Sequence, residues 1–226
     1  LTNSQFKKFK NIFSKKIKVI DCTFDISSSL KKRIEKIREE CEVAVREGSS
    51  SLILSDKKIS SSRASIPTIL AVGAVHSHLV KLGLRGYCSI NVESSDTLDT
   101  HSFAILIGVG ATTINPYLAI DSIYQRFEKK LFGKSDFKSC VTKFKKSIDA
   151  GLLKIMSKMG ISVISSYRGG CNFEAVGLSR AIVADYFPGM VSRISGIGII
   201  GIEKKIKDLH KKFSEKNIFA LPIGGL

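Results

Sequence analysis

Hydrophobic residues recur along this chain in two alternating patterns. Short apolar runs rich in β-branched side chains, typical of buried strands, occur at residues 17–20, 51–55, 87–92, 112–115 and 161–164. Elsewhere apolar residues return every three or four positions, as on one face of an α-helix, over residues 30–45, 67–82, 100–109, 118–131, 137–159 and 179–187. Strands that alternate with helices indicate parallel βα units with right-handed crossovers.

These five runs decide the predicted fold class. Residues 193–197 and 218–221 are weaker strand candidates, so a complete eight-stranded barrel cannot be counted. We predict an α/β fold of parallel βα units that forms a partial or deviant TIM-like (β/α) barrel. The whole chain is expected to be a single domain, with residues 1–16 as a surface lead-in and residues 56–66 as a polar loop. The helix at residues 67–82 is apolar nearly all round and is expected to be buried on two sides.

Polar residues directly follow several of the predicted strands. They are Asp25, Ser55, Asp56, Glu93, Ser94, Asn115, Tyr167 and Arg168. In a βα barrel or an open α/β sheet, ligands and neighbouring domains bind at this end of the strands. The sequence therefore predicts that functional contacts gather at the carboxyl ends of the strands.

The composition is that of one globular domain with a basic surface. With 226 residues, 43% of them hydrophobic, the chain can bury a sizeable core. The formal net charge of +16 is compatible with nucleic-acid binding. However, the lysines fall on the outer faces of several predicted helices with few aromatic residues between them, which favours a solvated surface. The chain begins at Leu1 and ends in an apolar stretch, and we expect a fragment of a longer protein.

The cysteines indicate a reducing environment. They are odd in number and widely spaced, and no two form a Cys-x-x-Cys pair: Cys22, Cys41, Cys88, Cys140 and Cys171. This pattern argues against a disulfide framework, a zinc site or an iron-sulfur cluster held by this segment alone. No apolar run reaches the length of a membrane span, and no signal peptide opens the chain. We expect a soluble, cytoplasmic protein.

Two short motifs have simple structural interpretations. Gly196-x-Gly198-x-x-Gly201 matches a dinucleotide-binding fingerprint, but no acidic residue ends a second strand about 20 positions later. A helix-entry turn is therefore favoured. His76 and His78 lie two positions apart on a predicted helix and point to nearly opposite faces. We interpret His76 as a core or interface histidine and predict no metal site.

The loop at residues 165–170, Ser-Ser-Tyr-Arg-Gly-Gly, combines features of a binding loop. Its small residues allow a partner to approach the backbone, and Tyr167 and Arg168 supply hydrogen bonds and a fixed positive charge. An anion is one candidate ligand. The favoured interpretation is structural: Arg168 pairs with a carboxylate such as Glu174, or with one from an adjoining domain.

Several sequence blocks occur in a fixed order: LILSD, ILAVGAVHSHLVKLGLR, HSFAILIGVGATTINPYLA, LLKIMSKMGIS, SYRGG and FEAVGLS. Together they resemble one enzyme family, the large chain of bacterial glutamate synthase. They are similar to the central region of that enzyme, which lies between an N-terminal glutamine amidotransferase domain and an FMN-binding synthase domain. The segments SSYRGGCNFEAVGLSR and FPGMVSRISGIG look most similar to the NADPH-dependent bacterial form.

The resemblance implies a function for the whole enzyme and a supporting role for this chain. The family makes two L-glutamate from L-glutamine and 2-oxoglutarate, with FMN, an iron-sulfur cluster, and NADPH with FAD through a small subunit. The central region joins the two domains of the same chain and helps to form an ammonia tunnel, so this fragment is expected to be inactive alone and to hold no cofactor. Residues 214–226 are expected to start the connection to the FMN-binding domain. No catalytic residue is assigned, and the tunnel or interface candidates are Asp56, Glu93, Asn115, Tyr167, Arg168 and Glu174.

Two alternatives of other classes stay open at this point. One is a free-standing βα-barrel enzyme that binds a phosphorylated small molecule at the late-strand glycines. The other is a basic nucleic-acid-binding module, whose affinity should fall steeply with salt. Neither has a specific motif in this sequence, whereas the resemblance spans most of the chain and predicts neither nucleic acid nor membrane as a partner.

Overall fold

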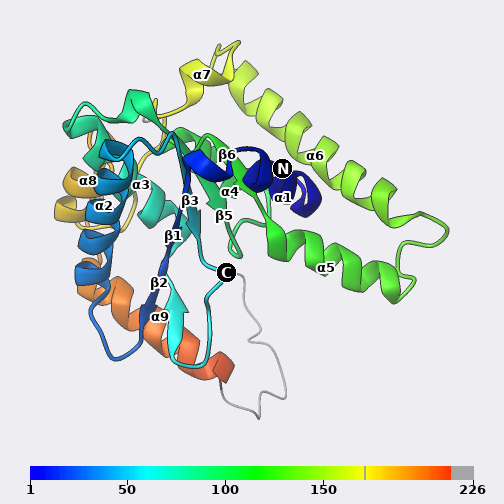
Figure 1. Ribbon diagram of the computed structural model, residues 1–226, viewed down its shortest axis with the longest axis horizontal. Helices are drawn as coiled ribbons and strands as arrows, with labels where there is room; N and C mark the ends of the chain where they lie inside the picture. The colour runs from blue at the N-terminus through cyan, green and yellow to red at the C-terminus, as the bar shows by residue number, and fades with distance from the viewer. Residues whose placement is uncertain (171, 215–226) are drawn as a thin grey trace.

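The computed structural model describes residues 1–170 and 172–214. Its centre is a parallel sheet, shown in Figure 1, with the strand order β1 (Ile17–Asp21), β3 (Ser51–Ser55), β5 (Ser89–Glu93) and β6 (Thr113–Asn115). Each strand pairs with the next in this series, so the order follows the chain and never reverses. A (β/α) barrel has this order, whereas a doubly wound sheet reverses it. The described residues form an open part of a barrel wall, and the predicted α/β fold with a partial barrel is confirmed.

Helices connect the strands in the predicted alternation. The chain passes through α2 (Leu30–Arg46) to β3, through α3 (Thr68–Lys81) to β5, and through α4 (Thr100–Gly108) to β6. The other described helices are α1 (Asn3–Ile12), α5 (Tyr117–Glu128), α6 (Phe137–Lys158), α7 (Ile164–Tyr167), α8 (Arg180–Tyr186) and α9 (Ile199–Ser214), with the 3₁₀ turns η1 (Ser14–Lys16) and η2 (Arg85–Tyr87). In Figure 1, α2, α3 and α8 lie to the left of the sheet, and α5 and α6 lie to the right.

The two faces of the sheet differ in chemistry. Leu54 and Val92 belong to one large hydrophobic core that also contains residues of α2, α3 and α4. Side chains alternate along a strand, so the residues next to Leu54 and next to Val92 point to the other face of the sheet. There Asn91 accepts a hydrogen bond from Thr113 Oγ1 at 2.6 Å and donates one to Ser51 Oγ at 2.7 Å. We call this polar side the inner face, because it corresponds to the inside of a closed barrel.

Helix α3 is buried on two sides, as its apolar sequence predicted. Leu70, Val72 and Val75 each expose 3% or less of their surface. The helix contacts α2, α4 and α8. Gly73 permits the close approach of α8, since a Cβ atom at this position would lie 2.3 Å from Phe187 Cε1.

The first 16 residues do more than lead in along the surface. Thr2 and Gln5 form a capping box that begins helix α1. Most side chains of α1 are exposed, but Phe6 exposes only 1% of its surface, and Lys10 binds Glu93 on the inner face. Helix α1 therefore lies against the carboxyl end of the sheet, a placement that the basic composition did not predict.

The predicted strand at residues 161–164 is wrong. Gly160, with φ +68°, ends α6, and Ile161 N donates to Met156 O at 2.9 Å. The chain then enters α7 (top of Figure 1), and Val163 exposes 52% of its surface. No sheet buries this run, because it follows the helix end without a neighbouring strand to pair with. A short apolar run alone does not reveal that difference.

A small antiparallel ribbon was missing from the sequence prediction. Strand β2 (Thr23–Asp25) pairs with β4 (Arg63–Ser65), which falls within the stretch predicted as a polar loop. Three-residue strands are too short to give a periodic signal. The weaker strand candidate at residues 193–197 contributes an isolated bridge, from Ile197 to Leu178, and no strand. Residues 218–221 lie outside the described part of the chain.

Candidate functional site

The candidate residues from the sequence do not gather at one edge of the sheet. Asp56, Glu93 and Asn115 lie at the ends of β3, β5 and β6, on the carboxyl edge, as predicted. Tyr167 and Arg168 lie in and just after α7, because the strand expected before them is not formed. The two groups therefore have to be considered as separate sites.

Glu93 is the centre of a buried charge network at the carboxyl edge. Its side chain exposes 4% of its surface. The carboxylate accepts hydrogen bonds from Lys10 Nζ at 3.0 Å and Ser55 Oγ at 2.8 Å, and Lys57 Nζ lies 2.8 Å away. Burial alone would raise the pKa of Glu93, but the hydrogen bonds from Lys57, Ser55 and Lys10 outweigh burial and lower the pKa. Ionised Glu93 therefore anchors α1 to the sheet.

Asp56 is also buried, but only one of its carboxylate oxygens is paired. Oδ2 accepts from the backbone nitrogen and the hydroxyl of Ser95 at 2.8 and 2.6 Å. Oδ1 is buried and has no hydrogen-bond partner within the described residues. Burial raises the pKa of Asp56, and the bonds from Ser95 offset part of that rise. Burial, followed by the charge of Asp56, also raises the pKa of the nearby Tyr117 hydroxyl.

Asn115 holds the start of the chain against the sheet. Its Nδ2 atom donates to Leu1 O at 3.0 Å and to Asn3 Oδ1 at 2.9 Å. Leu1 N in turn donates to Ile114 O at 2.7 Å. Asn115 exposes 1% of its surface, so these partners replace water. The bonds fix residues 1–3 beside β6, which is an edge strand of the described sheet.

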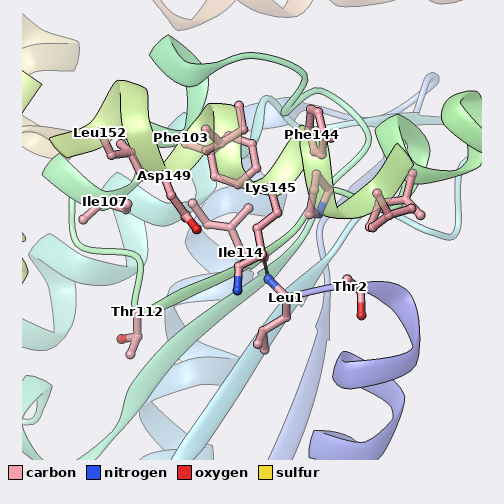
Figure 2. Close-up of a pocket in the computed structure, with 14 residues that line it drawn as sticks. Leu1, Thr2, Phe103, Ile107, Thr112, Ile114, Phe144, Lys145, Asp149 and Leu152 are labelled. Carbon is pink, nitrogen blue, oxygen red and sulfur yellow. Dashed lines mark hydrogen bonds between the residues drawn. The ribbon is translucent and has the colours of Figure 1, made fainter. Parts of the chain in front are cut away.

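A cavity of about 170 Å³ lies beside this anchored segment (Figure 2). Its lining is mostly apolar and comes from α4, β6 and α6, with Phe103 and Ile114 among the wall residues. Figure 2 shows Lys145 and Asp149 projecting from α6 toward Leu1. The apolar part of the wall favours neutral molecules, because charged groups lose more hydration free energy on entry. Lys145 and Asp149 also line the cavity, so its wall is not apolar throughout.

Tyr167 is a core residue. It exposes 0% of its surface and packs in a small cluster with Ala104 and Met156. Its ring meets Phe173 edge to face, with 6.2 Å between the centroids. Burial raises the pKa of its hydroxyl, which has no hydrogen-bond partner in the described part of the chain. Tyr167 thus fixes the position of the loop that carries Arg168.

The loop that carries Arg168 lies beside His76 and Arg85 at the amino edge of the sheet, since Gly169 faces the His76 ring and His76 bonds to Arg85. Arg85 donates to Gly110 O at 2.9 Å and to Cys88 O, just before β6 and β5 begin. Burial lowers the pKa of Arg85, and the charge of Arg168 adds to this effect. His76 Nδ1 accepts a hydrogen bond from Arg85 Nε at 3.1 Å. Burial, followed by the charge of Arg85, lowers the pKa of His76 to about 4, so this imidazole is neutral at physiological pH.

Glu174 is not the partner of Arg168. Its carboxylate lies 3.7 Å from Arg193 Nε instead. The Nε atom of Arg168 is buried and has no hydrogen-bond partner among the described residues. The predicted pair of Arg168 with Glu174 is therefore wrong, and a carboxylate from an adjoining domain stays a prediction.

The glycine motif is a turn between backbone segments. A Cβ atom on Gly196 would lie 2.1 Å from Gly177 O, so this glycine lets two stretches of chain cross closely. Helix α9 begins three residues later, at Ile199, which confirms the predicted helix-entry turn.

The two histidines face different partners. His78 Nε2 lies 2.9 Å from Glu42 Oε2, whereas His76 binds Arg85. The prediction that they point to different faces is confirmed.

The described residues do not fit an iron-sulfur cluster or another metal centre. The four described cysteines, Cys22, Cys41, Cys88 and Cys140, are buried free thiols. Such clusters need several thiolates converging on one point. Within residues 1–170 and 172–214, no three His, Cys, Asp or Glu side chains are arranged to hold a metal ion. The same part of the structure contains no helix with the length and apolarity that a bilayer crossing requires.

The sequence matches characterised proteins along its length. The family model of the glutamate synthase central domain matches residues 1–179. The chain belongs to this family. The glutamate synthase (NADPH) large chain of Azospirillum brasilense is 51% identical over 228 residues, which cover 100% of this chain and 15% of the relative. The corresponding Bacillus subtilis large chain is 41% identical over 214 residues, covering 94% of this chain and 14% of the relative.

A plant relative also matches most of the chain. The chloroplastic ferredoxin-dependent glutamate synthase of Spinacia oleracea is 40% identical over 216 residues, covering 88% of this chain and 13% of the relative. The chain thus spans about 15% of the length of the glutamate synthases that it matches. The resemblance seen in the sequence blocks is confirmed. Family membership supports the linking-domain interpretation and lends no support to the free-standing enzyme or the nucleic-acid-binding module.

Proposed function

We propose that this chain is the central linking domain of a glutamate synthase large chain. That enzyme makes two L-glutamate from L-glutamine, 2-oxoglutarate and a reductant. The match to the central-domain family over residues 1–179 carries the proposal, and the 51% identity to a large chain supports it. The chain joins an amidotransferase domain to an FMN-binding synthase domain of the same polypeptide and has no activity alone.

The cofactors and the remaining partner belong to other parts of the proposed enzyme. FMN and an iron-sulfur cluster reside in the synthase domain, and NADPH and FAD act through a small subunit. An NADPH-dependent relative is 41% identical to the chain, and a ferredoxin-dependent one is 40% identical. Another NADPH-dependent relative is 51% identical, which favours NADPH as the electron donor. Buried free thiols support a cytoplasmic location.

Within this role, the cavity beside β6 is proposed to form part of the ammonia tunnel. Ammonia released from glutamine is useful to the synthase reaction as neutral NH₃, which enters apolar space at a lower free-energy cost than NH₄⁺. Asn115 holds Leu1, one of the wall residues, and so closes one side of the cavity. Asp56 and Glu93 hold the neighbouring strand ends, and Glu93 also fixes α1 there.

The test replaces Asn115 with Ala in the full-length enzyme. The substitution leaves Leu1 O and Asn3 Oδ1 without their donor and lets water reach the wall of the cavity. More glutamine should then be hydrolysed than glutamate formed from it. A matched control is Asp121→Asn, which alters the other contact of Asn3, a 3.1 Å bond at the surface, and should leave the reactions coupled.

A second variant tests the cavity from the opposite wall. Leu152→Phe places a larger side chain at the lining and should slow ammonia transfer, while glutamine hydrolysis continues. Leu153→Phe is its control, since Leu153 is next in sequence, does not line the cavity and exposes 65% of its surface. If glutamine hydrolysis and glutamate formation stay fully coupled in both Asn115→Ala and Leu152→Phe, the proposed passage of ammonia through this cavity is contradicted.

A further inference from the structure

The guanidinium of Arg85 is held entirely by neutral groups. It donates to His76 Nδ1 at 3.1 Å, Gly110 O at 2.9 Å and Thr112 Oγ1 at 3.4 Å, and also to Cys88 O. No ion pair to Arg85 occurs within the described residues. Its position is therefore fixed while its charge stays uncompensated.

A second uncompensated guanidinium lies nearby. Arg168 is half-buried, and among residues 1–170 and 172–214 its Nε atom has no hydrogen-bond partner and no carboxylate forms an ion pair with it. The charge of Arg168 acts on Arg85 and helps to lower its pKa, so the two like charges repel. A buried or half-buried charge without a counter-ion is costly, and two together cost more.

His76 lies between Arg85 and the loop that carries Arg168. Because Arg85 always carries its protons, Nδ1 of His76 is the acceptor in their bond, and the proton of the neutral imidazole resides on Nε2. Nε2 faces Gly169, where a Cβ atom would lie only 3.2 Å away. Glycine at this position, with φ +71°, keeps the space beside the histidine narrow but unblocked by a side chain.

We propose that Arg168 binds a carboxylate, in the positive field that Arg85 adds. The guanidinium of Arg168 offers hydrogen-bond donors and matches the planar geometry of a carboxylate. One bound carboxylate would compensate part of the double positive charge and pair the buried Nε atom of Arg168. Cys88, whose thiol pKa is raised chiefly by burial, is neutral and does not supply that negative charge.

The carboxylate comes from an Asp or Glu side chain of the rest of the parent polypeptide. Three apolar residues close in sequence to Arg168 are exposed: Val163 by 52%, Ile164 by 39% and Val176 by 64%. Exposed apolar side chains around an uncompensated charge are typical of a surface that another protein surface covers. Since this chain spans 15% of the length of its relative from Azospirillum, most of such a parent lies outside it. The identity of the partner rests on the proposed linking role. The unpaired charge of Arg168 does not depend on that role.

The experiment compares Arg168→Gln and Arg168→Lys with the wild-type full-length enzyme by thermal unfolding. Arg193→Gln is the matched control, because Arg193 belongs to the same segment, has a side chain exposed by 78% and pairs only at 3.7 Å. Loss of a half-buried charged pair should lower the midpoint of Arg168→Gln by about 4 °C, with Arg168→Lys intermediate. Arg193→Gln should stay within about 1 °C of wild type.

A titration with sodium acetate, against sodium chloride at equal ionic strength, identifies the source of the carboxylate. If a side chain fills the site, acetate leaves the wild-type midpoint unchanged. If acetate raises the wild-type midpoint but not that of Arg168→Gln, the site takes free carboxylates and the side-chain source is overturned. If the unfolding midpoint of Arg168→Gln equals that of Arg193→Gln, with acetate and without it, the carboxylate site itself is overturned. Coupling of hydrolysis to synthesis is measured separately, at Asn115, so the linking role can fail or stand independently.

Discussion

Glu93→Gln is the substitution that best tests how helix α1 is held on the sheet. Glutamine keeps the size of the side chain and an oxygen for the bond from Ser55 Oγ, so the change removes the negative charge with little change in packing. The ammonium groups of Lys10 and Lys57, now 3.0 and 2.8 Å from the carboxylate, lose their counter-ion. The variant therefore isolates the charge of the network.

The expected loss of unfolding free energy is about 2 kcal/mol. A hydrogen bond to a charged group contributes roughly 1.5–3 kcal/mol when it is shielded from water. Lys10 has a side-chain exposure of 32%, and its share is near the lower end of that range. Lys57 is 48% exposed, so solvent screens it, and its share is about 0.5 kcal/mol. Removing one partner of a buried pair tends to cost more than the pair contributes, but both lysines here can regain water.

Urea denaturation of the chain at pH 7, followed by circular dichroism, measures this difference. Lys10→Met should cost more than Lys57→Met, since Lys10 is the less exposed partner. Both ammonium groups lie over a ring, Lys10 over Phe6 at 5.1 Å and Lys57 over Tyr117 at 5.0 Å, so this contact does not separate them. In the double variant Glu93→Gln/Lys10→Met, the two losses should not add, because both remove the same interaction. Additive losses would mean that Lys10 and Glu93 are stabilised independently.

The pH dependence gives the network a second signature. The pKa of Glu93 is lowered in the folded protein, so its contribution to stability is present above the unfolded value of 4.5 and is lost as the pH falls through the folded pKa. The difference between wild type and Glu93→Gln should be constant from pH 8 to about 5 and shrink below 4.5. Equal stability at pH 7, or a difference that persists undiminished at pH 3, would refute the proposed role of the charge.

Two further predictions concern packing and protonation elsewhere in the chain. Gly73→Ala should destabilise the protein by about 1–3 kcal/mol in the same urea assay, since the new Cβ would lie 2.3 Å from Phe187 Cε1. Gly86→Ala is the control: its Cβ would meet nothing within 4 Å, so stability should change by less than about 0.5 kcal/mol. The His76 imidazole should not titrate between pH 8 and 5 in NMR spectra and should report a pKa of about 4. Because this pKa lies below the unfolded value of 6.5, His76 lowers stability as the pH falls from 6.5 toward 4, and a measured value near 6.5 would contradict its burial beside Arg85.

The parts of the fold that repeat a pattern could be predicted from the sequence. Strand β3 and helix α6 appear where their periodicity placed them, because burial of one face or of a whole strand leaves a regular spacing of apolar residues. Helix α1 had a local signal in Thr2 and Gln5, which the basic composition obscured. The run at residues 161–164 had a strand composition but lacked a partner, which depends on the rest of the fold.

The candidate site was predicted in position but not in its pairings. Asp56, Glu93 and Asn115 lie at the predicted sheet edge, because the ends of parallel strands meet there. Their partners come from distant parts of the chain: Lys10 is 83 positions from Glu93. No spacing rule connects residues so far apart. Arg85 escaped notice for the same reason, since its role depends on backbone carbonyls before β5 and β6.

The two ends of the sheet differ in how far the described residues satisfy their charges, and this difference bears on where other domains bind. At the carboxyl edge, Glu93 is paired by two lysines, and α1 covers the strand ends. At the amino edge, Arg85 and Arg168 carry two positive charges with neutral acceptors or none. Because an unpaired half-buried charge is unfavourable, the amino edge gains more from a partner surface than the carboxyl edge does. A domain that links two others would then place one contact at this edge and keep the cavity beside β6 for transfer between them.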